Sequence, residues 1–252
     1  MQISGRKIWV IGASAGIGEA VARELARQGA VLALSARNGA ALEQIAVETG
    51  REGVLTLPLD VTDRQALEAA KDRLLAAWGA IDCMVFVAGV YHPMRADAID
   101  EAKALQTFQI NFIGAFQAVA AVLPSMLKAK AGNLVLFSSV AGFRGLPNSL
   151  VYGASKAALT NFTETLKLDL AEKNIGVQVV HPGFVKTRLT DKNEFQMPFL
   201  IEADEAARCV VNGMAGDSFE IHFPKRFTCF MKFMRLLPYP AYFWLTRKLL
   251  GV

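Results

Sequence analysis

The chain has 252 residues, 53% of them hydrophobic, which fits one α/β domain with a sheet buried on both faces and excludes a disordered chain. Its three cysteines are widely spaced and no metal-ligand spacing joins its three histidines, so we expect no disulfide framework, no metal site and a cytoplasmic location. The net charge of +4 comes from residues 219–252, which hold six cations and one acid, so binding to nucleic acid is disfavoured.

Short β-rich runs alternate with segments of helical spacing along the chain. We expect strands at 7–11, 31–36, 54–59, 83–87, 134–138 and 177–181. We expect helices at 17–28, 40–49, 64–78, 115–127, 154–172 and 203–215. This alternation predicts a Rossmann-type doubly wound parallel sheet in a single catalytic domain, residues 1–218. A seventh strand at 219–223 would add at the sheet edge, and residues 219–252 form a basic, aromatic and amphipathic C-terminal extension.

A glycine-rich turn lies between the first strand and the first helix, with the sequence Gly12-Ala13-Ser14-Ala15-Gly16-Ile17-Gly18. Glycines there permit a tight turn and let backbone N–H groups and the positive end of the helix approach a pyrophosphate. The candidate contacts to a dinucleotide cofactor are Gly12, Ser14, Gly16, Ile17 and Gly18. The spacing of these glycines differs from the common dinucleotide fingerprint, and the alternative is an ordinary glycine-rich turn.

The end of the second strand predicts which nicotinamide cofactor is preferred. No carboxylate stands there to accept hydrogen bonds from the ribose 2′-OH, whereas Ala36 leaves room for a 2′-phosphate and Arg37 offers donors to it. We therefore expect NADP(H), with NAD(H) as the second choice, unless Arg37 caps a helix or faces solvent. Asp60, followed by Val61, ends the third strand and is placed to meet the adenine, or instead to cap the next helix.

Tyr152 and Lys156 are four residues apart, so on a helix they share a face. A phenol of pKa about 10 exchanges protons poorly at neutral pH, and a neighbouring ammonium lowers that pKa. We expect Tyr152 to exchange a proton, with Lys156 lowering its pKa and holding the cofactor. The alternative is a tyrosine packed at a helix start beside a solvated lysine.

Two polar residues upstream complete the candidate catalytic set. Ser139 follows an apolar strand at its carboxyl end, where doubly wound folds place ligands, and its hydroxyl could hold a substrate carbonyl. Asn111 lies in an apolar helical surround and could hold a water near Lys156. Their alternatives are a strand-end hydroxyl and a satisfied core amide.

With these motifs in this order, the chain resembles the short-chain dehydrogenase/reductase family, in its compact single-domain branch, over residues 7–191. The resemblance implies that Asp60 is the adenine-side aspartate and that the catalytic tetrad is Asn111, Ser139, Tyr152 and Lys156. It also implies that the cofactor is bordered by Ala88, Gly89, Pro182, Gly183, Val185 and Thr187. Three positions depart from the family pattern: Ile11 replaces a threonine, and Phe86-Val87 replaces two asparagines that steady the central sheet.

The mechanism that the resemblance implies is hydride delivery from NADPH to a carbonyl held by Ser139, while Tyr152 donates a proton. Replacement protons pass through Lys156, the ribose and a water at Asn111, and the reverse reaction oxidises an alcohol. We therefore expect an NADP(H)-dependent carbonyl reductase or alcohol dehydrogenase, assembled as a homodimer or homotetramer. The alternatives are a non-catalytic NADP-binding sensor or scaffold, and a lyase or epimerase that uses the cofactor transiently.

Three loops, residues 90–96, 142–148 and 184–200, are expected to line the substrate site. Their apolar members suggest a hydrophobic ketone or secondary alcohol, or else ordinary loop packing, and are Met94, Phe143, Leu146, Phe184, Phe195, Met197 and Phe199. In the extension, the longest uncharged run, 236–246, is well below the roughly 20 residues that span a bilayer. We expect the extension to lie on an anionic membrane surface, or to pack over the substrate cleft or a partner subunit.

Overall fold

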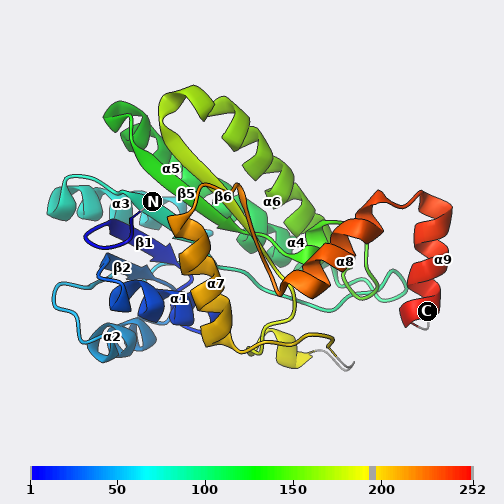
Figure 1. The fold of residues 1–252 in the computed structure, drawn as a ribbon. Helices are drawn as coiled ribbons and strands as arrows, with labels where there is room; N and C mark the ends of the chain where they lie inside the picture. The colour runs from blue at the N-terminus through cyan, green and yellow to red at the C-terminus, as the bar shows by residue number, and fades with distance from the viewer. Residues whose placement is uncertain (1, 193–196, 251–252) are drawn as a thin grey trace.

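The computed structural model describes residues 2–192 and 197–250. In this part of the chain one parallel sheet runs in the order β3-β2-β1-β4-β5-β6-β7 (Figure 1). Its strands are β1 (Lys7–Ile11), β2 (Val31–Ser35), β3 (Leu55–Thr56), β4 (Cys83–Phe86), β5 (Gly132–Phe137), β6 (Ile175–Pro182) and β7 (Glu220–Phe223). The order turns back between β1 and β4, which confirms the predicted Rossmann-type doubly wound fold and creates the crevice where such folds bind ligands.

Helices cover both faces of the sheet. One face carries α1 (Gly16–Arg27), α2 (Gly39–Glu48) and α7 (Ala203–Ala215), and the other carries α3 (Arg64–Trp78), α4 (Glu101–Phe108), α5 (Gly114–Ala129) and α6 (Leu150–Asp169). Side chains of β1 alternate between the two cores: Ile8 and Val10 pack under α1, while Trp9 and Ile11 pack under α3 and α5. A strand period of two, with both faces apolar, is what buries a parallel sheet in this way.

The predicted elements are confirmed within two residues at each end, apart from two. The third strand is reduced to Leu55–Thr56, although the amides of Leu57 and Leu59 still donate to the carbonyls of Leu34 and Ala36 beyond it. The fifth predicted helix, α6, begins at Leu150 instead of residue 154 and ends at Asp169 instead of residue 172, so Tyr152 lies inside its first turn. Gly153 allows this start, because a Cβ there would lie 3.0 Å from the carbonyl oxygen of Ala141.

Residues 101–129 form a continuous helical stretch that the sequence analysis only partly predicted. It consists of α4, the π-helix η1 (Gln109–Ile113) and α5. By length and composition alone it could cross a membrane, but half of its apolar window is buried against the rest of the protein. We therefore describe it as a core element.

The C-terminal extension begins in the sheet, because the predicted seventh strand, β7, pairs with β6. It continues as α8 (Lys225–Leu236) and α9 (Tyr239–Leu250), which reach outward beyond the β7 edge (Figure 1). The guanidinium of Arg144 donates to the carbonyls of Met234 and Leu237 and lies 4.2 Å from the centre of the Tyr242 ring. The Tyr242 hydroxyl donates to the Gly145 carbonyl. These contacts fasten both helices to the loop after β5.

Candidate active site

A cleft of about 520 Å³ opens at the carboxyl ends of β1, β2, β4, β5 and β6. It collects residues that are far apart in sequence, at the switch point of the sheet. The predicted site residues that line it are Gly12, Ser14, Gly16, Ile17, Gly18, Arg37, Asp60, Val61, Ala88, Gly89, Ser139, Tyr152, Lys156, Pro182, Gly183, Val185 and Thr187. Asn111 is fully buried and lies behind this surface.

The glycine turn leaves no room for side chains at two of its glycines. Gly12 has φ +100°, and a Cβ there would lie 2.4 Å from the Ala88 nitrogen; a Cβ on Gly18 would lie 2.0 Å from the Gly12 oxygen. Both positions therefore need glycine, and they bring the end of β1 against that of β4. No side chain caps the start of α1, so its N–H groups face the cleft. The turn fits the pyrophosphate of a dinucleotide.

The end of the cleft predicted to hold the adenosine contains Arg37 and Asp60. Neither residue caps a helix, because Asn38 caps α2 and Asp63 caps α3. The Asp60 carboxylate accepts hydrogen bonds of 2.9 and 2.8 Å from the Thr62 amide and hydroxyl. Burial raises the pKa of Asp60, but these hydrogen bonds and the charge of Arg37 lower it below its ordinary value. An ionised acceptor and an exposed guanidinium thus stand side by side.

Ser139 and Tyr152 meet at the inner end of the cleft. Ser139 caps the 3₁₀ helix η2 (Val140–Gly142), its hydroxyl accepting from the Ala141 amide, and it also hydrogen-bonds the Tyr152 side chain. The ring of Tyr91 packs edge-on against Tyr152, with 5.0 Å between centroids. Burial raises the pKa of Tyr152 to about 12, although the hydrogen bond to Ser139 acts to lower it. The phenol is therefore fully protonated at neutral pH.

Lys156 lies below Tyr152 and is almost completely buried, so the alternative of a solvated lysine is wrong. Its ammonium donates to the Phe137 carbonyl at 2.7 Å and lies 5.9 Å from the centre of the Tyr152 ring. Burial lowers the pKa of Lys156 to about 8. The prediction that this ammonium lowers the pKa of Tyr152 is wrong in this arrangement, because burial dominates and the ammonium is directed at Phe137.

Asn111, in the π-helix η1, connects this helix to Val90 and to Ser155 through its side-chain amide. Its side chain accepts from the Val90 amide at 2.8 Å and donates to the Val90 carbonyl at 3.0 Å and the Ser155 hydroxyl at 3.1 Å. A Cβ on Gly89 would lie 3.3 Å from Oδ1 of Asn111 and 3.5 Å from Nζ of Lys156, so both side chains border Gly89. The alternative of a satisfied core amide is right for the Asn111 side chain, and the water expected near Lys156 stays a prediction.

Some residues that line the cleft were not predicted as site residues, among them Ile110, Phe137 and Ser138. Tyr91, Arg188, Leu189 and Thr190 also line it, and they belong to two of the loops predicted to line the substrate site, 90–96 and 184–200. Tyr91 follows β4 by a few residues, at the carboxyl end of a central strand. The other three come from the loop after β6. The Thr187 amide donates to the Thr190 hydroxyl, and this turn lays Thr187 against Gly16.

None of the described members of the predicted apolar lining is among the residues that line the cleft. Phe143, Leu146 and Phe184 pack with Phe227 and Met231 of α8, and Met94 is buried. For these residues the alternative of ordinary packing is right, and the extension packs beside the cleft through its inner face. Met197 is half-buried and Phe199 exposed, while Phe195 lies outside the described residues.

The three histidines were predicted to have no part in metal binding. Within the described residues no cluster of His, Cys, Asp and Glu could hold a metal ion. His181 lies between the Thr160 hydroxyl, 3.1 Å from Nε2, and the Glu220 carboxylate, 2.9 Å from Nδ1. Glu220 is also paired with Lys232, so the network joins α6, the sheet and α8.

Fold and site together define a nicotinamide-dependent oxidoreductase. The family model of short chain dehydrogenases matches residues 6–197. The chain belongs to the short-chain dehydrogenase/reductase family.

Known proteins support this membership. An uncharacterized oxidoreductase of Myxococcus xanthus is 36% identical over 243 residues, 96% of each chain. The 2,3-dihydro-2,3-dihydroxybenzoate dehydrogenase of Bacillus subtilis is 37% identical over 73% of this chain and 72% of its own. Among solved structures, an alcohol dehydrogenase of Thermococcus sibiricus complexed with 5-hydroxy-NADP is similar, with a TM-score of 0.79, 26% identity, and coverage of 87% of this chain and 96% of that one.

Proposed function

We propose that this oxidoreductase is an NADP(H)-dependent carbonyl reductase and alcohol dehydrogenase that acts on a hydrophobic ketone or secondary alcohol. The observation that carries the proposal is that Ser139, Tyr152 and Lys156 line one cleft beside the glycine turn. The Ser139 hydroxyl is also close enough to the Tyr152 phenol to act on its pKa. Two hydroxyls in contact can bind one carbonyl oxygen together, and hydride addition at a carbonyl needs both stabilisation and protonation of that oxygen.

The residues divide this chemistry between them. Bound NADPH supplies the hydride, or NADP takes it up in the reverse direction. Tyr152 is protonated at neutral pH and donates its proton to the substrate oxygen, while Ser139 donates a hydrogen bond to the same oxygen. Lys156 keeps a charged, buried ammonium at the cleft floor, where it holds the cofactor ribose and passes a replacement proton toward Tyr152.

The preference for NADP(H) rests on the end of β2. Ala36 is small, Arg37 is exposed at the mouth of the cleft, and the nearby Asp60 carboxylate accepts its hydrogen bonds from Thr62. A 2′-phosphate is a good partner for a guanidinium, whereas a ribose hydroxyl finds no carboxylate at the end of β2. The 5-hydroxy-NADP complex of the similar archaeal alcohol dehydrogenase supports this choice.

The hydrophobic substrate is favoured by the apolar part of the cleft lining. Val90, Tyr91 and Leu189 contribute to it, and the ring of Tyr91 packs directly against Tyr152. An apolar wall with two convergent hydroxyls is typical of a site that orients a ketone within a largely hydrophobic molecule.

For assembly and location, we propose a cytoplasmic homodimer or homotetramer. Large apolar side chains are exposed on α5 and α6, among them Phe116 and Leu168, and burying them between subunits would remove them from water. Light scattering on the purified protein measures the mass, and a monomer at working concentration would contradict the assembly.

The test of the function is a substrate panel. Ketones, aldehydes, steroids and acyl substrates are assayed with NADPH and with NADH, following the absorbance of the reduced nicotinamide. We expect turnover of apolar ketones that is faster with NADPH and absent in Tyr152→Phe. Tight NADPH binding without any turnover would instead identify a sensor or scaffold. Substrate conversion without net change in reduced cofactor would identify a lyase or epimerase.

A further inference from the structure

The outward face of α8 is apolar and open to solvent. Phe230, Phe233 and Leu236 follow one another at intervals of three residues, and all three are exposed, Leu236 to 81%. The opposite face of the same helix carries Phe227 and Met231, which are buried against the loop after β5. The helix is therefore apolar on both sides, and only the inner side has a partner within the described chain.

The outward face of α9 has the same character. Tyr239, Phe243 and Trp244 are exposed, Trp244 to 62%, while Tyr242 and Thr246 on the other side are buried. Tyr239 and Phe243 stack with 5.8 Å between their centroids. Exposed Trp and Tyr in a group differ from the scattered single apolar residues that any protein surface shows.

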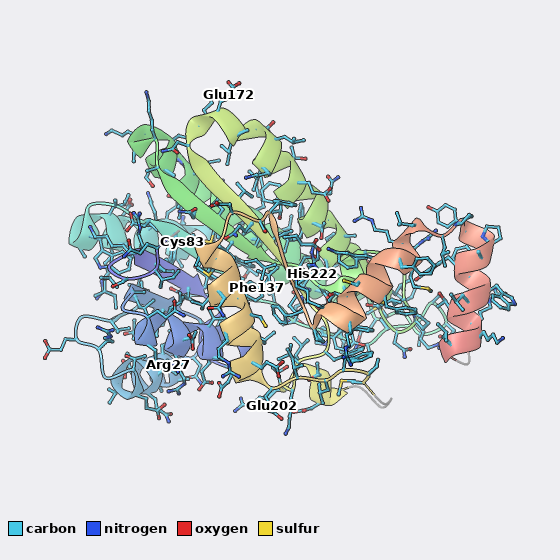
Figure 2. All side chains as sticks on the ribbon, in the orientation of Figure 1. Arg27, Cys83, Phe137, Glu172, Glu202 and His222 are labelled. Carbon is cyan, nitrogen blue, oxygen red and sulfur yellow. The ribbon has the colours of Figure 1, made fainter. Side chains whose placement is uncertain are left out.

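These faces rest on a packed support. Arg144 and Tyr242 fasten α9 and the end of α8 to the loop after β5. At the start of α8, the Thr228 hydroxyl lies 2.6 Å from Nδ1 of His222, a residue of β7 that lies close to α8 (Figure 2). The exposed aromatic side chains are thus held on a fixed surface, at the end of the molecule away from the β3 edge (Figure 1).

The charged side chains of α8 and α9 are all positive. Residues 225–252 contain no Asp or Glu, and within the part of the chain that the structure describes Lys232 is the one of their six cations with an ion-pair partner, Glu220. Arg226 on α8 and Arg247 and Lys248 on α9 are exposed, and no carboxylate of the described residues forms an ion pair with these three. The Lys248 ammonium lies 5.1 Å from the centre of the Trp244 ring. Cations therefore alternate with aromatic rings across the exposed surface.

We propose that the outward faces of α8 and α9 bind the surface of an anionic lipid bilayer. The aromatic side chains enter the boundary between headgroups and acyl chains. Trp and Tyr are enriched at this boundary because one end of each side chain is apolar and the other is polar. The unpaired Arg and Lys side chains reach the anionic headgroups, an attraction that adds to the burial of apolar area. The enzyme then lies on the membrane without spanning it.

A second copy of the chain is a poorer occupant of the same surface. A two-fold dimer brings identical patches together, so the cations of one copy would face those of the other. Like charges buried without acids between them oppose association, whereas lipid phosphates and carboxylates neutralise them.

The experiment is co-sedimentation of the full chain with vesicles of phosphatidylcholine alone and of phosphatidylcholine mixed with phosphatidylserine. Variants Phe233→Ser with Trp244→Ser remove two exposed rings, and Arg247→Gln with Lys248→Gln removes two cations. Leu105→Ser with Val47→Ser is the matched control, since these residues are exposed on α4 and α2, outside the patch and outside the exposed faces of α5 and α6. Circular dichroism and turnover in detergent-free buffer verify that every variant is folded.

We expect the wild type and the control to bind vesicles containing phosphatidylserine, and each patch variant to bind roughly tenfold less. Binding should fall in about 1 M salt, where charges are screened beyond about 3 Å. Equal sedimentation of the patch variants and the control, or no binding to anionic vesicles, would overturn the proposal. A patch variant whose mass by light scattering is half that of the wild type would assign the surface to a second copy and also overturn it.

Discussion

The ammonium of Lys156 donates a hydrogen bond to the backbone carbonyl of Phe137, 2.7 Å away. The contact ties the catalytic helix α6 to the end of β5, near the centre of the molecule, where Figure 2 labels Phe137. A buried cation is costly unless fixed dipoles hold it, and this carbonyl is such a dipole. Because burial lowers its pKa to about 8, Lys156 is able to exchange a proton near physiological pH.

Replacing Tyr152 with Phe should abolish proton transfer while keeping the cofactor site. The phenyl ring still packs on Tyr91, but the proton donor and the hydrogen bond to Ser139 are lost. We expect kcat to fall about 10²–10⁴-fold, the usual contribution of a positioned acid. Steady-state kinetics measures this loss, and fluorescence titration should show NADPH affinity within about twofold of wild type.

Tyr91→Phe is the control, since it removes a hydroxyl from the neighbouring ring. It should keep most of the activity. A Tyr152→Phe enzyme as active as Tyr91→Phe would show that another group donates the proton.

Lys156→Met should change how stability depends on pH. The pKa of Lys156 is about 8 in the folded chain against 10.5 ordinarily, so between these values the unfolded chain binds more protons and stability rises with pH. The free energy of unfolding of the wild type relative to the variant should therefore rise by about 1–3 kcal/mol from pH 8 to 10. Urea denaturation at each pH measures it.

The exposed Lys128→Met serves as the comparison and should keep the pH slope of the wild type. Parallel curves for wild type and Lys156→Met would mean that the buried amine titrates at its ordinary value.

Arg37→Ala should weaken NADPH far more than NADH. Removing a guanidinium from a phosphate loses a charge-assisted contact, so we expect KM for NADPH to rise about 10–100-fold and KM for NADH to change less than about threefold. Arg73→Ala, an exposed arginine of α3 away from the cleft, should leave both values unchanged. Equal effects on the two cofactors would remove Arg37 from phosphate recognition.

Gly12→Ala should strongly destabilise the fold. The new Cβ would lie 2.4 Å from the Ala88 nitrogen, and φ is +100°, a conformation that side chains disfavour. We expect a loss of about 2–5 kcal/mol in the free energy of unfolding. Gly145→Ala is the matched control, because nothing lies within 4 Å of its added methyl. Similar urea midpoints for the two variants would contradict the close contact of β1 with β4.

Glu220→Gln should weaken the attachment of α8 in a pH-dependent way. Burial raises the pKa of Glu220, but the hydrogen bonds to His181 and Lys232 lower it by more than burial raises it. The resulting pKa is about 2. Such a carboxylate stabilises the fold above its ordinary pKa of 4.5, and this contribution is lost as pH falls through the folded value of about 2.

At pH 7 the variant should therefore lose about 1–3 kcal/mol, and the difference should shrink toward pH 3. The exposed Glu202→Gln should cost less than about 0.5 kcal/mol. A difference between wild type and Glu220→Gln that stays constant with pH would show that the carboxylate charge is not what holds α8.

Local pattern was sufficient for the architecture. The period of two in the strands, the helical spacing between them and the glycines at 12, 16 and 18 each reflect backbone geometry within a few residues. The order of Ser139, Tyr152 and Lys156 along the chain was therefore enough to locate the cleft and the family. Elements set by tertiary packing were less predictable, such as the early start of α6 against Ala141.

Only the tertiary structure determined the protonation of the site residues and which face of each C-terminal helix is packed or exposed. Phe137 lies 19 residues from Lys156, and Val90 lies 21 from Asn111, so no local pattern reveals which carbonyl holds the ammonium or which backbone group satisfies the amide. Burial, which sets the pKa of Tyr152, and the division of α8 into a packed and an exposed face likewise depend on distant segments. Sequence determines which groups are present, whereas their protonation and exposure follow from the neighbours that folding places around them.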